Sequence, residues 1–357
     1  MNKDSFVFSK RSIKSFHTVW KAPSNIALVK YWGKYGVQLP KNPSISFTLS
    51  NCVTTTEVSF SPNNKKKFPT FEFYFNKNER KDFHPKINQF FEYILPYFPI
   101  LEDHHMVISS INSFPHSSGI ASSASAMAAL ALCVVDFEKQ FHPELGEQDF
   151  FKKASFLARL GSGSASRSIK GPLTLWGKSP AFRDSSDLYA IPFDSGIHKI
   201  FKTYCDTILI VDKEKKQVSS SVGHKLMQEH PFAENRFDQA NRNCEFLKSV
   251  LKIGDIERFI EITESEALTL HSMMMTSSPS YILLKPNTLN IINKVWEYRV
   301  QTNTPISFTL DAGANVHLLY PAIESDKVIT FIKSELLDYC QSGQFIQDHV
   351  GQGAKKM

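Results

Sequence analysis

The sequence contains few cysteines, and their positions exclude two common kinds of stabilising site. The five cysteines of this 357-residue chain are far apart, odd in number and without a Cys-x-x-Cys pair. A structural zinc site or a disulfide framework needs clustered or regularly spaced cysteines. We therefore expect the thiols to be free and buried.

Long apolar runs and dense charge are missing as well. No apolar stretch reaches the roughly 18 residues that span a bilayer, and the chain does not open on the apolar run of a signal peptide. The net charge of +6 comes from scattered Lys and Arg, and the densest run, Lys65 to Lys67, lies among turn-forming residues. That run predicts a solvated hairpin loop and not a nucleic-acid patch. We expect a cytoplasmic protein that binds neither a membrane nor nucleic acid.

The distribution of apolar residues predicts strands first and helices later. Hydrophobic residues form 42% of the chain, which is sufficient for a well-buried core. Runs rich in Val, Thr, Phe and Ile predict strands over residues 19–30, 44–60 and 69–75. Helical spacing predicts later helices over residues 233–252, 255–274 and 287–302. The pattern indicates an α+β fold, with a strand-rich N-terminal domain at 1–187 and a helix-rich C-terminal domain at 188–357.

A segment of small residues, FPHSSGIASSASAMAALA at 114–131, is suited to binding phosphate. The N–H groups and the positive dipole end at a helix N-terminus attract anions, and small side chains let an anion approach. The segment is not a Walker A loop, and an Ala-rich core helix with an ordinary cap is the alternative. The predicted phosphate contacts are Ser117, Ser118, Gly119, Ala121, Ser122, Ser123 and Ser125. The hydroxyl of Ser123 is also the candidate contact for Mg²⁺.

Three further segments carry polar groups of the kind that binds anions. In RLGSGSASRSIKG, glycines permit tight turns and Arg167 supplies a planar fork that suits a carboxylate or a phosphate. In SFTLDAGANVHLLY, Asp311 ends an expected strand, where a carboxylate can face a cleft. In SNIALVKYWGKYG, Lys30 and Lys34 flank two aromatics. Each segment alone also fits a surface turn, a capping Asp or a solvated strand edge.

Together these segments resemble a known family. P-x-x-x-G-I-A-S-S-A-S resembles the phosphate loop of the GHMP kinases, and APSNIALVKYWGK, GSGSASRS and FTLDAG are similar to motifs of the diphosphomevalonate decarboxylases. The matching segments follow the family order from Ala22 to Asn315. The resemblance implies a two-lobed GHMP-kinase-like fold around one cleft. Its N-terminal domain would be similar to ribosomal protein S5 domain 2, and its C-terminal domain would be ferredoxin-like.

The resemblance also implies an activity, that of an ATP-dependent carboxy-lyase of isoprenoid biosynthesis. ATP with Mg²⁺ would phosphorylate the 3-hydroxyl of mevalonate 5-diphosphate, and loss of phosphate and CO₂ would leave isopentenyl diphosphate. A homodimer is expected. The alternatives are a decarboxylase of mevalonate 5-phosphate, a mevalonate-type kinase without decarboxylation and a non-catalytic metabolite sensor.

The resemblance assigns roles to individual residues. The catalytic residues would be Asp311, Lys30, Arg167 and Ser123. The substrate-binding residues would be Tyr31, Trp32, Gly33, Lys34, Ser162, Gly163, Ser164, Arg167 and Ser220, with Ser220 on a Ser-rich loop. Since an ordinary Asp has a pKa near 3.9, Asp311 is a weak base for an alcohol. We expect it to orient the hydroxyl, to accept its proton late and to stabilise positive charge as phosphate leaves.

Overall fold

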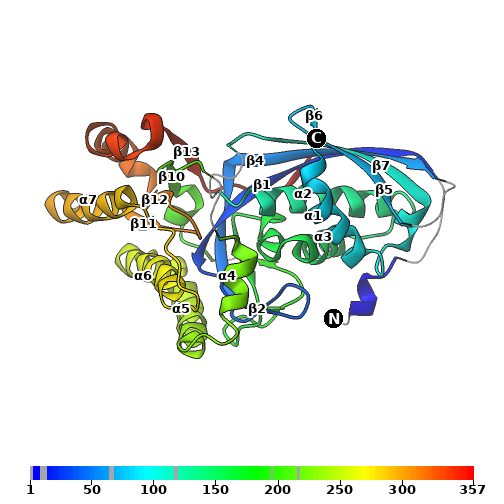
Figure 1. The fold of residues 1–357 in the computed structure, drawn as a ribbon. Coiled ribbons are helices and arrows are strands. Elements are labelled where there is room, and N and C mark those ends of the chain that lie inside the picture. The colour runs from blue at the N-terminus through cyan, green and yellow to red at the C-terminus, as the bar shows by residue number, and fades with distance from the viewer. Residues whose placement is uncertain (1–2, 9–13, 64–67, 116–119, 194–195, 215–217) are drawn as a thin grey trace.

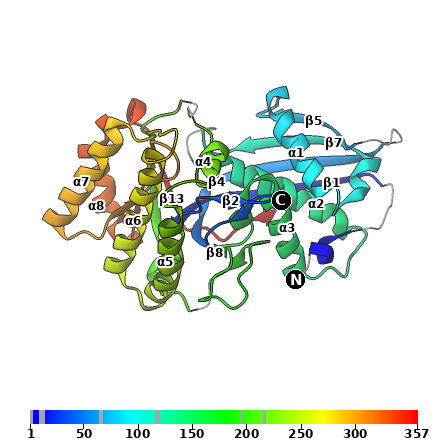
Figure 2. The same ribbon diagram turned by 60° about the horizontal axis from the view of Figure 1, so that its bottom comes forward.

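The chain folds into two lobes that lie side by side. The structure, a computed structural model, describes residues 3–8, 14–63, 68–115, 120–193, 196–214 and 218–357. One lobe contains the long strands with helices α1, α2 and α3, and the other contains helices α5, α6, α7 and α8 (Figures 1 and 2). This arrangement confirms the predicted α+β class, with strands concentrated in the first part of the chain and helices in the second.

The first lobe is built on a mixed sheet, which has eight strands within the described residues. Its main path runs in the order β14-β1-β4-β7-β5-β6, and β8 pairs with both β4 and β9. The strands are β1 (Phe16–Val29), β4 (Ser44–Pro62), β5 (Thr70–Phe75), β6 (Asn78–Glu79), β7 (His104–Asn112), β8 (Leu173–Trp176), β9 (Ile191–Pro192) and β14 (Lys355–Lys356). The helices of this lobe are α1 (His84–Ile94), α2 (Ser122–Lys139) and α3 (Glu147–Gly161).

The predicted hairpin between the second and third expected strands is wrong. Strand β7 lies between them, antiparallel to β4 and parallel to β5. The turn-forming residues after β4 do end that strand, but they do not determine its partner, because strand pairing depends on contacts distant in sequence. Residues 64–67 of this connection lie outside the described part of the chain.

The burial pattern of strand β1 changes along its length, and its fully buried end lies next to the site. Its first half alternates buried and partly exposed residues, whereas residues 22–29 are all buried. Helix α2 packs against β1 from the first lobe, and α5 and α6 pack against it from the second. Since both faces of the strand end are covered, residues 26–29 form an apolar run, as in strands that are covered on both sides. The buried Ser24 and Asn25 before this run use their side chains as hydrogen-bond donors.

The second lobe contains an antiparallel sheet in the order β11-β12-β10-β13. The strands are β10 (Cys205–Leu209), β11 (Ser307–Thr309), β12 (Val316–Tyr320) and β13 (Phe345–His349). The helices are α4 (Ser220–Leu226), α5 (Ala233–Ile253), α6 (Ile256–Met275), α7 (Pro286–Thr302) and α8 (Ser325–Phe331). The three long helices begin and end within a few residues of the predicted bounds, because their apolar spacing is regular.

Buried polar contacts tie the two lobes together. The carboxylate of Asp348 in β13 accepts hydrogen bonds from the backbone N–H groups of Ser50, Asn51 and Cys52 in β4. The chain then returns to the first lobe, where β14 pairs with β1 (Figure 1). Relative movement of the lobes at this edge would therefore break several backbone contacts.

Two expectations from composition can be compared with the fold. All five cysteines are free, and four of them are buried while Cys205 is half-buried. Among the described residues, no helix combines the length and the apolar composition that crossing a membrane requires.

Candidate active site

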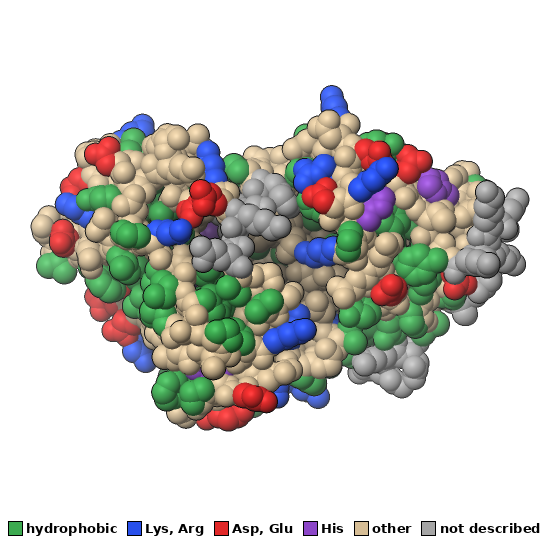
Figure 3. Space-filling model, in the orientation of Figure 1, with side chains coloured by type: hydrophobic (Ala, Val, Ile, Leu, Met, Phe, Trp, Pro, Cys, Tyr) green, Lys and Arg blue, Asp and Glu red, His purple; other side chains and the backbone are tan. Residues whose placement is uncertain are grey.

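A cavity of about 590 Å³ lies between the two lobes and contains most of the predicted site residues. Figure 3 shows the surface hollowed at this place. The predicted residues that line it are Lys30, Tyr31, Trp32, Lys34, Ala121, Ser122, Ser123, Ser162, Gly163, Ser164, Arg167, Ser220 and Asp311. Segments far apart in the sequence are thus brought to one place.

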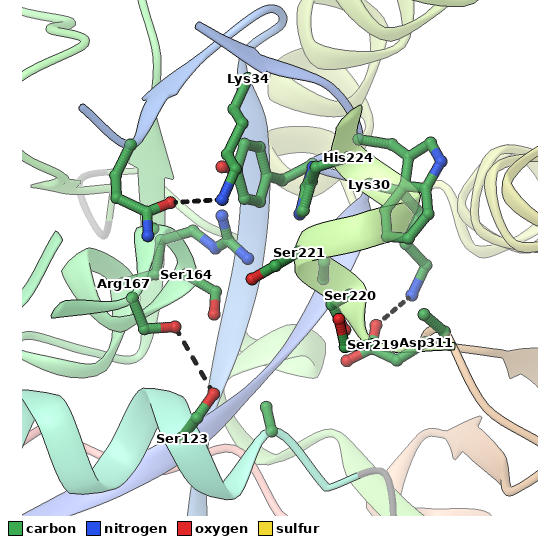
Figure 4. A pocket seen from close by; sticks show the side chains of 18 of the residues that line it. Lys30, Lys34, Ser123, Ser164, Arg167, Ser219, Ser220, Ser221, His224 and Asp311 are labelled. Atoms are coloured by element: carbon green, nitrogen blue, oxygen red, sulfur yellow. Dashed lines mark hydrogen bonds and ion pairs between the residues drawn. The ribbon is translucent and has the colours of Figure 1, made fainter. Parts of the chain in front are cut away.

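The centre of the cavity is an ion pair between the lobes. The Lys30 Nζ atom lies 3.1 Å from Asp311 Oδ1, and the dashed line on the right of Figure 4 marks this contact. The Lys30 side chain is 1% exposed and the Asp311 side chain is 26% exposed. Burial lowers the pKa of Lys30, and the charge of Asp311 opposes that shift. Two residues to which the resemblance assigns catalytic roles are therefore in contact.

The backbone of Lys30 is held by a second, fully buried ion pair. Its N–H donates to Glu266 Oε2 at 2.8 Å, and its carbonyl accepts from Arg236 Nη2 at 3.2 Å and from Asn42 Nδ2 at 2.9 Å. Arg236 of α5 and Glu266 of α6 pair with each other, and both side chains are 0% exposed. Asn243 donates a further hydrogen bond to Glu266. This clamp fixes Lys30 to the second lobe.

The turn that carries Asp311 is fixed at both ends. The Asp311 carbonyl accepts from Gly313 N–H at 2.7 Å and lies 3.1 Å from His271 Nε2. Asn315 then accepts the N–H groups of Val211 and Asp212, just beyond β10. His271 thus contacts the backbone of Asp311 and not its carboxylate. The carboxylate of Asp311 is the one acidic group among the cavity-lining residues that the structure describes.

Arg167 enters the cavity from a 3₁₀ helix, η4 (Gly163–Ser168), and is 2% exposed. Its Nε and Nη1 atoms donate to Ser46 and Ser44, which lie two residues apart on one face of β4. Burial lowers the pKa of Arg167 to about 10, so the guanidinium remains charged at neutral pH. The two serines hold one edge of the guanidinium and leave Nη2 without a hydrogen-bond partner among the described residues.

Tyr31 and Gly163 meet at the wall of the cavity. A Cβ atom at Gly163 would lie 2.8 Å from the Tyr31 hydroxyl and equally close to Trp176, so glycine is required there. The Tyr31 hydroxyl is buried and has no hydrogen-bond partner in the described structure. Burial raises the pKa of Tyr31, which keeps this hydroxyl protonated. A buried hydroxyl without a partner beside a cavity suits a ligand oxygen.

The start of helix α2 lies on the opposite side of the cavity (Figure 4). Ala121 precedes the helix with φ of 44°, and the Ser123 hydroxyl lies 3.5 Å from that of Ser162. Ser125 is different, because its side chain is fully buried and its hydroxyl lies 2.6 Å from Thr54 Oγ1. Its predicted phosphate contact is therefore corrected to a packing contact with β4. Ser117, Ser118 and Gly119 lie outside the described residues.

The predicted Ser-rich loop is in fact the short helix α4. Ser219 caps it by accepting the N–H of Val222, and Ser219, Ser220 and Ser221 all line the cavity. Gly223 allows a close approach, since a Cβ there would lie 2.5 Å from the Trp32 ring. Trp32 is 4% exposed and packs in a cluster with Met227 of the same segment.

Gly33 supports the site from behind and does not line the cavity. Its φ of +97° is one that side-chain-bearing residues rarely adopt, and strands β2 (Lys34–Tyr35) and β3 (Leu39–Pro40) follow as a small hairpin. The Gly33 N–H donates to His224 Nδ1 at 3.0 Å. The substrate contact predicted for Gly33 is thus replaced by a contact with α4.

The cavity attracts anions. Lys34 lines it, and its pKa is lowered by desolvation and then by Lys225. Lys86 of α1 lines the same wall, and desolvation followed by Lys34 lowers its pKa. With Lys30 and Arg167, these groups outnumber the one carboxylate of the described lining. Anionic substrates would relieve this repulsion.

Comparison with known proteins places the chain in a family. The family model described as the diphosphomevalonate decarboxylase-like N-terminal domain matches residues 22–188, and that of the mevalonate 5-diphosphate decarboxylase C-terminal domain matches residues 207–355. The chain is 30% identical to the diphosphomevalonate decarboxylase of Danio rerio over 82% of this chain and 73% of that protein. The chain belongs to the diphosphomevalonate decarboxylase family. It is also 28% identical to the Candida albicans enzyme, over 87% of this chain and 86% of that protein.

Solved structures of this family have the same fold. Mevalonate diphosphate decarboxylase from Staphylococcus aureus superimposes with a TM-score of 0.82 at 29% identity, over 96% of this chain and 98% of that chain. A structure titled as a complex with MVAPP, AMPPCP and magnesium superimposes with a TM-score of 0.81 at 27% identity, over 96% of this chain and 99% of that chain. The predicted GHMP-kinase-like fold is thereby confirmed.

Several cavity-lining residues of this family member were not predicted from the sequence. They are Gln38, Lys86, Gln89, Ser219, Ser221 and His224. His224 could not be identified because its partner, Gly33, is 191 residues away. The available signal for Lys86 was its position next to the apolar face of the amphipathic segment KINQFFEYIL.

Proposed function

We propose that this chain converts mevalonate 5-diphosphate and ATP into isopentenyl diphosphate, ADP, phosphate and CO₂. The observation that supports this activity best is the Lys30–Asp311 ion pair, which shares one cavity with the guanidinium of Arg167. The reaction needs a group at the reacting hydroxyl and fixed points for the anionic ends of the substrate. The carboxylate of Asp311, beside the buried ammonium group of Lys30, provides the first, and the guanidinium of Arg167 provides one of the fixed points.

The substrate would be oriented by its two ends. In our proposal, Arg167 holds the carboxylate through Nη2, while Ser44 and Ser46 keep the guanidinium from rotating. Lys34 and the buried Tyr31 hydroxyl receive the diphosphate, together with the serines of η4 and α4. The 3-hydroxyl between the two ends then lies at Asp311.

The chemical steps use Asp311 as a positioning group and a late proton acceptor. The hydroxyl oxygen attacks the γ-phosphorus of ATP, its proton passes to Asp311, and the bond to ADP breaks. Phosphoryl transfer is loose, so positioning matters more than early removal of the proton. The C3–O bond then breaks as phosphate leaves, the carboxylate carbon leaves as CO₂, and the released electron pair forms the double bond. As phosphate departs it takes the proton from Asp311, and the carboxylate so restored stabilises the positive charge that develops at C3.

The residues present suit ATP and Mg²⁺. The described residues contain no group of three or more His, Cys, Asp or Glu side chains that could hold a metal ion. Magnesium usually keeps few protein ligands and is carried by phosphate oxygens, so this lining suits it. Bound Mg²⁺ would neutralise charge on the phosphates, with Ser123 as its candidate protein contact. Ser122 and Ala121 would contact the phosphates beside it.

A single assay tests the activity and its substrate. ADP and CO₂ are measured with ATP and, in turn, mevalonate, its 5-phosphate or its 5-diphosphate. We expect both products from the diphosphate. CO₂ release from the monophosphate alone, or ADP without CO₂, would contradict the proposal.

We further propose that the chain acts as a cytoplasmic homodimer, with its domains divided between residues 187 and 188. The support is the family resemblance together with the strand-rich and helix-rich composition of the two parts. Sedimentation velocity tests the dimer, and limited proteolysis tests the boundary. A monomeric mass at micromolar concentration would contradict the first proposal, and preferred cleavage elsewhere would contradict the second.

A further inference from the structure

His224 lies in the wall of the cavity, and neither the sequence motifs nor the proposed chemistry gives it a role. It projects from α4 beside Lys34 (Figure 4). Its ring lies between two aromatics of the segment SNIALVKYWGKYG, 4.3 Å from the Tyr31 centroid and 4.6 Å from the Trp32 centroid. The residue is only 7% exposed. The imidazole is therefore fixed in place by rings on two sides.

The hydrogen bond to Gly33 determines where the proton of this imidazole lies. The Gly33 N–H donates to Nδ1 at 3.0 Å, so Nδ1 must present its lone pair. A neutral imidazole then carries its proton on Nε2. Burial, followed by the charges of Lys34 and Arg167, lowers the pKa of His224 to about 3, so the ring is neutral at physiological pH. Nε2 has no hydrogen-bond partner among the described residues.

The position of the ring indicates which part of a ligand it meets. The reacting hydroxyl belongs at Asp311, which pairs with Lys30. His224 lies instead with Lys34, at the end of the cavity where cations from β2 and α1 gather. A further positive charge there would increase the repulsion, whereas a neutral N–H adds a hydrogen bond to an anion without it.

We propose that His224 is a substrate-binding residue whose Nε2–H donates a hydrogen bond to the diphosphate end of the substrate, and that it contributes to the preference for a diphosphate over a monophosphate. The identity of the substrate rests on the function proposed above. The presence of an anion-binding N–H at this position rests only on the geometry of the ring.

Two substitutions distinguish the roles of the two ring nitrogens, Nδ1 and Nε2. His224→Gln places an amide near the position of Nε2, and His224→Asn places one near Nδ1. We expect His224→Asn to raise KM for mevalonate 5-diphosphate by about tenfold or more, the usual effect of losing one hydrogen bond to a charged group. His224→Gln should recover much of that loss, and KM for ATP should change less than twofold.

His230 provides a matched control. It is 6% exposed, and its Nδ1 accepts the backbone N–H of Phe232 in the same way that His224 accepts that of Gly33. Its Nε2, however, contacts the Met273 carbonyl and Thr276, and it does not line the cavity. His230→Gln should leave KM for the diphosphate substrate unchanged. An equal rise of KM in His230→Gln and His224→Asn would overturn the proposal.

A binding experiment tests the N–H independently of turnover. Inorganic pyrophosphate is titrated into wild type and the His224 variants by calorimetry, and into ¹⁵N-histidine-labelled wild type by NMR. The signal of His224, assigned by its loss in His224→Asn, should show a protonated Nε2 that shifts on addition of pyrophosphate. An Nε2 signal that does not move, or equal pyrophosphate affinity of wild type and His224→Asn, would overturn the proposal. If no mevalonate substrate is turned over, the proposed function is rejected. The pyrophosphate titration would still decide whether the N–H of His224 binds an anion.

Discussion

The ammonium group of Lys30 and the carboxylate of Asp311 form an ion pair at 3.1 Å, although 281 residues separate them in the chain. Lys30 follows strand β1 of the first lobe, whereas Asp311 follows strand β11 of the second. The site therefore exists only when the lobes are assembled, and the clamp of Arg236 and Glu266 on the Lys30 backbone is part of that assembly.

Replacement of Asp311 tests its role directly. In Asp311→Asn the side chain keeps its size but can neither accept the hydroxyl proton nor stabilise positive charge. We expect kcat to fall by at least about 100-fold, the usual lower range for loss of a general base, while the Kd for the substrate changes little. The measurements are steady-state release of ADP and equilibrium binding of the substrate. Normal turnover in this variant would reject the assignment.

The two lysines of the segment SNIALVKYWGKYG should affect different kinetic constants. Lys30 is buried and contacts Asp311, so Lys30→Met should mainly lower kcat. Lys34 donates to Gln38 at 3.1 Å and lines the cavity away from Asp311, so Lys34→Met should mainly raise KM for the diphosphate substrate. Both constants are obtained from one substrate titration for each variant. Equal effects of the two substitutions on both constants would contradict this division.

The fully buried pair of Arg236 and Glu266 should be important for stability. In Arg236→Met, the Glu266 carboxylate keeps its buried charge but loses its partner, and breaking such a pair typically costs about 3 to 5 kcal/mol. The measurement is the free energy of unfolding from urea titration. The control is Arg258→Gln, which breaks an exposed pair with Glu261 and should change stability by less than about 1 kcal/mol. A similar loss in the two variants would show that Arg236 and Glu266 do not form a clamp.

The sequence was sufficient to predict many helices and strands and most of the residues that line the cavity. It was not sufficient to predict which side chains contact one another. The bounds of the three long helices followed from apolar spacing, because this spacing depends on local geometry. Ser125 was misassigned because it lies opposite Ser123 on α2, where β4 covers it. The pairing of strand β5 with β7 likewise depends on contacts that no local pattern encodes.

Two residues of the site that were missed, His224 and Glu266, share one property: their roles depend on the other lobe. His224 was part of a Ser-rich segment read as a loop, and only the fold brings it to Gly33. Glu266 was an ordinary acidic position in a helix, and its contact with the Lys30 backbone spans 236 residues. Such contacts follow from the packing of one lobe on the other, which the family resemblance implied only in outline.

His224 should also make the stability of the protein depend on pH. In the unfolded chain His224 binds a proton below its ordinary pKa of about 6.5, whereas in the folded protein burial, Lys34 and Arg167 lower that pKa to about 3. Between these values the unfolded state binds more protons. Stability due to this group is therefore complete above pH 6.5 and decreases as the pH falls, by up to about 1.4 kcal/mol per unit.

His224→Gln removes this titration and should give a shallower dependence of stability on pH. The charged groups that face the ring, Lys34 on β2 and Arg167 on η4, remain in the variant, as does the Tyr31 ring. The experiment compares free energies of unfolding for wild type and variant at pH 7.5, 6 and 5. We expect wild type to lose about 2 kcal/mol more than the variant between the highest and the lowest pH. Parallel curves for the two proteins would mean that His224 is protonated as readily in the folded state as in the unfolded one, and the lowered pKa of His224 would be rejected.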